Sequence, residues 1–139
     1  MDPVWELQTA IYARLSQDAA LTSLIGADKV YDNPPADTNG NIPAATYPYV
    51  SFGDASSSDD SADCVDAAEV TFQINCWSSL PSQKQVRQIA DAVTKALRRW
   101  EPPLSVNALV TFDYWRTDYI RAPGINQASI QYTAVIETP

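Results

Sequence analysis

The side chains in this 139-residue chain that could do chemistry are mostly carboxylates, and the sequence contains no histidine. Histidine is the commonest general base and a frequent zinc ligand, so the usual catalytic triads and most zinc sites cannot be built. The two cysteines, Cys64 and Cys76, have no activating base nearby in sequence, and the four glycines are isolated. We therefore expect no catalytic residue, no metal and no cofactor, and we do not expect an enzyme.

An acidic segment between residues 54 and 69 is the densest group of such side chains. Its members are Asp54, Asp59, Asp60, Asp63, Asp66 and Glu69. Calcium prefers several carboxylate and carbonyl oxygens, but this spacing does not match a recognised calcium loop. The composition favours a solvated, flexible loop over residues 54–66, and a partner-binding loop is the second interpretation. In that second case Asp59, Asp60 and Asp63 belong to the interaction surface.

Large aromatic residues are the other candidates. Trp77 and Trp115 fall on the nominally polar faces of their strands, which indicates either a second packing layer or an interface. Trp100 continues the apolar stripe of a helix and is expected in the core. Trp77 and Trp115 therefore join the acidic residues as candidate interaction residues, with local packing as the alternative for both.

The element that places Trp77 is a strand followed by a long helix. Residues 70–77 alternate apolar and polar side chains, which is typical of a strand with one buried face, and Cys76 falls on that face. Residues 82–100 then repeat apolar residues at steps of three and four, which predicts an amphipathic helix. Ser82 and Gln85 have the spacing of a capping box at its start.

The remaining elements follow from the same patterns. Asp2 and Pro3 predict the start of a first helix ending near Gln17, and Asp18 is expected to cap a short helical turn that ends at Gly26. Strands are predicted around residues 29–32, 48–53, 110–114 and 130–136, with a loop over 33–46 and a turn over 122–127. These elements predict a single α+β domain over residues 1–139. It would hold a mostly antiparallel four- to five-stranded sheet with two amphipathic helices on one face.

The overall composition limits the partners. A formal net charge of −8 argues against nucleic-acid recognition and against docking on an anionic membrane surface. The first residues lack the pattern of a signal peptide, and no run is long enough for a membrane helix, so we expect synthesis in a cytoplasm. A sheet of this size has open edges, and such edges invite pairing with another copy, as in a ring.

Several blocks of the chain, taken in order, resemble the small tail-completion proteins of tailed bacteriophages. The blocks are Leu7 to Leu15, Asp18-Ala-Ala-Leu21, Leu24-Ile-Gly26, Val30-Tyr-Asp32 with Pro34-Pro35, Pro48 to Gly53, Phe72 to Ser78, and Ile89 to Val93 with Leu97. The sequence departs from the family pattern where Asp54 to Asp66 lengthens a normally short loop, and at the Pro81 interruption. The resemblance covers nearly the whole chain.

The resemblance implies a structural protein of the virion, made in the bacterial host cytoplasm and located at the head-proximal end of the tail. It implies a ring, six-fold in related proteins, that caps the tail-tube protein and joins it to the head connector and neck proteins. The alternative from another class is a small cytoplasmic α+β ligand-binding or regulatory module. Such a module would have a concave apolar pocket with a few convergent polar groups.

Overall fold

The computed structural model describes residues 1–62 and 64–139, and over these residues the chain forms three α-helices and a five-stranded sheet. The helices are α1 (Pro3–Ser16), α2 (Ala19–Ile25) and α3 (Lys84–Leu97), and a 3-10 turn covers Ala44–Thr46. The strands are β1 (Val30–Tyr31), β2 (Tyr49–Asp59), β3 (Asp66–Ser78), β4 (Ala108–Ala122) and β5 (Ile125–Thr138). The expected α+β class is confirmed, with α2 as a short third helix.

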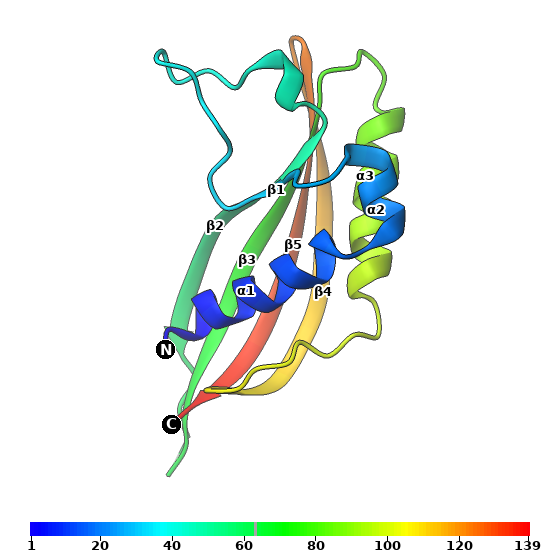
Figure 1. Ribbon diagram of the computed structural model, residues 1–139. Coiled ribbons are helices and arrows are strands. Elements are labelled where there is room, and N and C mark those ends of the chain that lie inside the picture. Colours follow the sequence, from blue (N-terminus) through cyan, green and yellow to red (C-terminus); the bar gives the residue numbers. More distant parts are fainter. Residues whose placement is uncertain (63) are drawn as a thin grey trace.

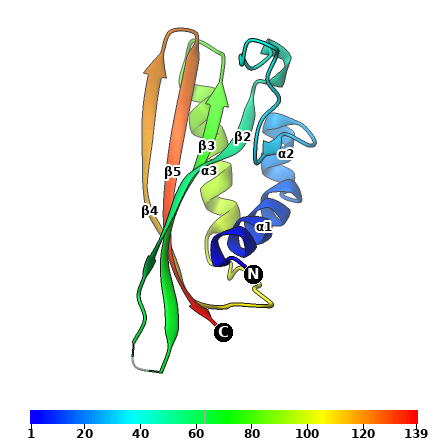
Figure 2. The same cartoon turned by 90° about the vertical axis from the view of Figure 1, so that its left-hand side faces the viewer.

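The sheet has the spatial order β1-β2-β3-β5-β4, and only the short β1–β2 pair is parallel. The helices lie on one face of the sheet, and no described element covers the other face (Figure 1, Figure 2). This two-layer arrangement lets each amphipathic helix bury its stripe against alternate residues of the strands. It also leaves one whole sheet face and two sheet edges available.

The core lies between the helices and the inner sheet face, as the periodicity predicts. Cys76 is fully buried in it, and burial raises the pKa of its thiol, which favours an inert, reduced side chain. The largest fully buried side chains are Leu7, Ile11, Leu15, Leu21, Val50, Val70, Ile74, Val86, Ile89, Val93, Ile130 and Ile136.

The first two helices begin where their capping residues predict. The Asp2 carboxylate accepts hydrogen bonds from the backbone N–H groups of Val4 (2.7 Å) and Trp5 (3.2 Å). Asp18 accepts one from Leu21 N–H at 2.9 Å. Each carboxylate therefore satisfies N–H donors that have no partner inside the helix.

The expected capping box at α3 is wrong, and the helix is shorter than 82–100. The helix begins at Lys84 with Gln83 as its cap, while Gln85 instead accepts a hydrogen bond from the Ser78 hydroxyl at 2.6 Å. Ser78 is fully buried, so its hydroxyl needs a partner and takes the Gln85 side chain that the box would have used. The helix ends at Leu97, so Trp100 lies beyond it, where its ring packs edge-on against Phe112 at 6.2 Å between ring centroids.

The expected loop over residues 54–66 is also wrong for its first part. β2 continues to Asp59, pairing Ala55 with Phe72 and Asp59 with Ala68, and the connection to β3 spans only residues 60–65. Serine and aspartate have low strand propensity, but the ladder with β3 satisfies their backbone groups and overrides that preference. The same effect lengthens β4 and β5, so the predicted turn over 122–127 shrinks to Pro123 and Gly124, where Gly124 has a positive φ of 75°.

Glu6 anchors the connection that leads from α3 into β4. Its side chain is only 6% exposed, and its two oxygens accept hydrogen bonds from the backbone N–H groups of Ser105 (3.0 Å), Val106 (2.9 Å) and Asn107 (3.0 Å). The Asn107 amide donates a further bond at 3.0 Å. These bonds, led by the one from Val106, lower the pKa of Glu6 to about 2. An ionised Glu6 on α1 therefore holds the start of the edge strand β4 in place.

Candidate interaction surfaces

The acidic residues are carried by the hairpin of β2 and β3, which projects beyond the rest of the sheet (Figure 2). Asp59 and Asp60 are exposed near its tip. The Ser61 hydroxyl and backbone N–H both donate to the Asp59 carboxylate, at 2.5 Å and 3.1 Å, and lower its pKa. Asp63, the third acidic candidate, lies outside the described residues. The hairpin therefore presents exposed carboxylates at one end of the molecule.

Metal binding receives no support from the described part of the hairpin. Within residues 1–62 and 64–139, no three Cys, Asp or Glu side chains come together in a group that could hold an ion. The carboxylates are spread along two strands instead. Among these residues the only ion pairs are Lys95 with Asp91 and Arg116 with Asp118, so Asp59 and Asp60 have no cationic partner there.

Trp77 lies half-buried on the uncovered face of the sheet. Its indole Nε1–H donates to the Ser51 hydroxyl at 2.9 Å, and its ring stacks on Tyr49 with 6.0 Å between ring centroids. Ser51 and Tyr49 belong to the neighbouring strand β2, so Trp77 ties the two strands together. This geometry favours local packing, one of the two interpretations that the sequence left open for Trp77.

Trp115 is 55% exposed on the edge strand β4. The register of β4 against β5 shifts between Tyr114 and Arg116, which makes Trp115 the extra residue of a bulge. A second register shift, between Leu109 and Thr111, makes the exposed Val110 the extra residue of another bulge. The Arg116 guanidinium lies over the Trp115 ring, 4.7 Å from its centroid. Trp115 is thus a large aromatic side chain presented at an open edge, which suits an interface.

The uncovered face beside Trp77 is a polar network. Gln127 donates to Asn75 Oδ1 at 3.1 Å, and Gln131 donates to Asp118 Oδ2 at 3.0 Å. Gly53 lies against this network, because a Cβ there would stand only 2.5 Å from Asn75 Nδ2. The alternation of polar residues along each strand predicts a wet face. The pairing of β3 with β5 that assembles the network could not be predicted from one sequence.

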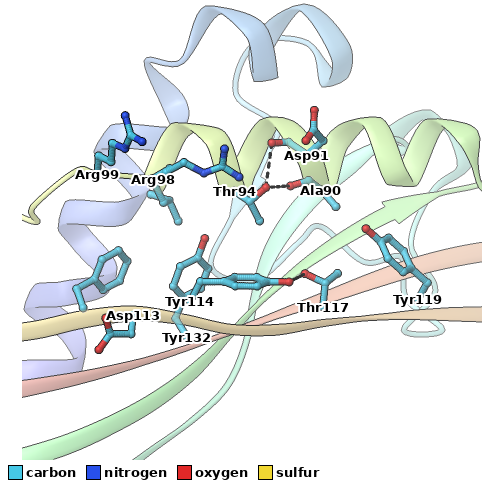
Figure 3. A pocket seen from close by; sticks show the side chains of 12 residues that line it. Ala90, Asp91, Thr94, Arg98, Arg99, Asp113, Tyr114, Thr117, Tyr119 and Tyr132 are labelled. Carbon is cyan, nitrogen blue, oxygen red and sulfur yellow. Dashed lines mark hydrogen bonds between the residues drawn. The ribbon is translucent and has the colours of Figure 1, made fainter.

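A groove of about 410 Å³ runs between α3 and the edge strand β4 (Figure 3). Sequence reasoning missed it, because no local pattern shows that α3 leaves β4 partly uncovered. Tyr114 and Tyr119 rise from β4 on one side, and the Tyr114 hydroxyl shares a 2.7 Å hydrogen bond with Thr117. Arg98 and Arg99 lie at one end, just after α3. The groove combines aromatic rings with two exposed guanidinium groups.

The groove has further charges along its length. The Arg87 guanidinium lies 4.3 Å from the Tyr119 ring centroid, an arrangement that favours the cation over the aromatic face. Asp91 and Asp113 also line the groove, and Asp91 is engaged by Lys95 at 2.9 Å. With Arg87 and Lys95 counted beside the lining Arg98 and Arg99, four cationic side chains stand against two acidic ones here, although the chain as a whole is strongly acidic.

Comparison of the chain with known protein families identifies one match. The family model described as tail completion protein gp17 matches residues 9–137. A chain in the solved structure entitled "Virion of native gene transfer agent (GTA) particle" has a similar fold, with a TM-score of 0.84. The two chains are 27% identical, and the match covers 98% of each.

No curated protein sequence matches the chain at a significant level. Over the described residues, no helix is both long and apolar enough to cross a membrane. The family match extends over nearly the whole chain, including α3 and the strands around Trp77, which carried the resemblance in the sequence. This chain therefore belongs to the tail completion protein gp17 family and is a structural protein of phage-like tails.

Proposed function

We propose that this chain is a tail terminator, a subunit that closes the tail tube at its head-proximal end and joins it to the head connector. The family match over residues 9–137 carries this proposal. The likeness to a chain of a gene transfer agent virion supports a place in the finished particle. The chain would be made in the host cytoplasm and would act without a cofactor or a catalytic step.

The subunit would act as a ring of identical copies, six in number as the resemblance implies. Two properties of the fold support a ring. The sheet ends on one side in β2, whose longer part from Phe52 to Asp59 is not paired by β1, and on the other side in β4. Surfaces at opposite edges of one subunit can meet head to tail, and such contacts close into a ring when the rotation permits.

Trp115, Asp59, Asp60 and Asp63 would contact partners in this assembly, namely a second copy, the tail-tube protein or a neck protein. Trp77 would stabilise the uncovered face of the sheet through its hydrogen bond to Ser51 and its stacking on Tyr49. The alternative, a small ligand-binding module, would need a pocket that surrounds most of its ligand. The groove beside α3 instead runs along an edge strand with exposed Tyr114 and Tyr119, which suits a protein partner better.

The proposal is tested by adding the purified chain to polymerising tail-tube protein. We expect tubes whose one end carries a ring and no longer elongates in electron micrographs. The Trp115→Ala variant should cap tubes less well than Trp5→Ala, a matched control whose tryptophan is 53% exposed on α1. Tubes that keep elongating at both ends, with no chain bound, would contradict the proposal. A chain that is monomeric when free would not, because the tube can serve as the template.

A further inference from the structure

The charges of this chain are segregated along the sequence and therefore in space. Residues 30–83 contain eight acidic residues and no lysine or arginine, whereas residues 84–121 contain seven of the nine basic residues and four acidic ones. The first segment forms β2 and β3, and the second forms α3 and β4. Because the sheet order places β2 near one edge and β4 at the other, the two edges carry opposite charge.

The acidic edge ends in the projecting β2–β3 hairpin. Its described carboxylates are Asp54, Asp59, Asp60, Asp66 and Glu69, all of them exposed. None of these five forms an ion pair with a described residue. These like charges repel one another in the free chain, so the hairpin favours a cationic partner.

The basic edge holds the groove between α3 and β4. Arg98 and Arg99 lie at its mouth without an ion pair among the described residues. The rings of Tyr114 and Tyr119 line one wall, and the aromatic stack of Phe112 on Tyr132, with ring centroids 5.1 Å apart, lies beneath them. The charges that line the groove balance, Arg98 and Arg99 against Asp91 and Asp113. The groove becomes net cationic only when its neighbours are counted, namely Arg87 on the Tyr119 ring and Lys95 paired with Asp91.

We propose that the β2–β3 hairpin of one copy docks into the α3–β4 groove of the next copy. The inference rests on the proposed ring, and it identifies which surfaces of two copies meet. The occupant is a second copy because the acidic β2–β3 hairpin and the cationic α3–β4 groove lie at opposite edges of the sheet in the same chain. One contact of this kind, repeated, propagates head to tail and can close.

Side chains, not a continuous backbone ladder, would make this contact. The bulges at Val110 and Trp115 break the regular hydrogen-bonding edge of β4, and bulges of this kind oppose edge-to-edge strand pairing. This modifies the expectation that the open edge itself pairs with another copy. Trp115 would instead lie at the rim of the docked hairpin, beside the groove.

Charge reversal tests the docking. Replacing Arg98 and Arg99 by glutamate, or Asp59 and Asp60 by lysine, should raise the concentration needed for ring formation about tenfold, because each variant turns exposed ion pairs into repulsions. Mixing the two variant chains should restore assembly with the variants alternating, because one interface then joins the two reversed surfaces and the next joins the two unchanged ones. Combining all four changes in one chain should also restore the ring. Asp28→Lys with Glu101→Lys is the control, because it changes the net charge as much as the hairpin variant does.

Cross-linking locates the contact directly. Cys64 is exposed at the hairpin tip, and Thr94→Cys places a second thiol in the groove. A short bismaleimide should convert assembled Thr94→Cys chains into a ladder of covalent oligomers. The ladder should vanish when Cys64→Ser is added, and Ser23→Cys on α2 should give none.

The outcomes separate this inference from the proposed function. If the wild-type chain neither forms rings nor caps tubes, the proposed function fails. If it does so, but charge reversal has no effect and the ladder is absent, only the docking inference is overturned. If the reversed variants still form rings but no longer cap tubes, the groove binds the tube protein instead of a second copy, which also overturns the inference.

Discussion

Replacing Trp77 and Trp115 by alanine should separate a packing residue from a surface residue. Both tryptophans fall on nominally polar strand faces, but among the residues that the structure describes only Trp77 of the two donates a side-chain hydrogen bond, to Ser51 at 2.9 Å. Trp115 is 55% exposed and touches mainly the Arg116 guanidinium. The two substitutions remove the same side chain from the same sheet, so their difference reports the surroundings alone.

The expected magnitudes follow from these contacts. Truncating the half-buried Trp77 removes roughly 120 Å² of buried apolar surface, which corresponds to a loss of about 3 kcal/mol of stability at ~25 cal/mol/Å². The lost hydrogen bond to Ser51, itself buried, adds about 1 kcal/mol. Trp77→Ala should therefore lower the free energy of unfolding by about 3–4 kcal/mol. Trp115→Ala should lower it by no more than about 1 kcal/mol, the value of an exposed cation–π contact.

Urea denaturation followed by circular dichroism measures both values, provided that the slope of the transition stays constant. Trp77→Phe gives an internal check, because it keeps most of the stacking on Tyr49 and removes the hydrogen-bond donor; about 1–2 kcal/mol should be lost. If Trp115→Ala destabilised the monomer as much as Trp77→Ala, Trp115 would be a packing residue. Its assignment to the assembly interface would then be wrong.

Three further predictions concern the monomer. Glu6→Gln should destabilise the chain at neutral pH, because a neutral amide cannot replace a carboxylate that accepts hydrogen bonds from three backbone N–H groups. The pKa of Glu6 lies near 2 in the folded chain, against an ordinary value of 4.5. In acid-unfolding curves the stability advantage of the wild type should therefore be full above pH 5 and disappear as the pH falls towards 2. Equal acid sensitivity of the two proteins would contradict this role. Asp2→Ala should lower the unfolding free energy by about 1 kcal/mol in the same urea assay, because it removes the cap of α1; Asp2→Asn should retain most of it. A thiol reagent should modify Cys64 within the native protein but Cys76 only on unfolding, since Cys76 is fully buried; modification of both at one rate would show that the core opens readily.

The sequence predicted the helical side of this fold well because its signals are local. Asp2 and Asp18 cap their helices as their types predict, and the apolar stripe around Ile89 faces the core. The strands around Ile74 and Ile130 were found for the same reason, since period-two alternation is visible within one segment.

What the sequence could not reveal depends on partners distant in the chain. The serines of β2 form a strand only because β3 supplies the other half of the ladder, and Gln85 abandons its capping role only because Ser78 is buried beside it. The α3–β4 groove was missed because it exists between elements, and no spacing along one segment reports it. Trp115 was found as a candidate, but the bulge that presents it depends on the register with β5.

The most direct test of the central claim is electron microscopy of tail tubes assembled with and without this chain, with the bound subunits counted at each tube end. We predict a ring of identical copies at one end only, the head-proximal end, where elongation stops and purified connector then binds. Chains scattered along the tube wall, or tubes that elongate at both ends and bind connector without the chain, would contradict the claim that this protein terminates the tail.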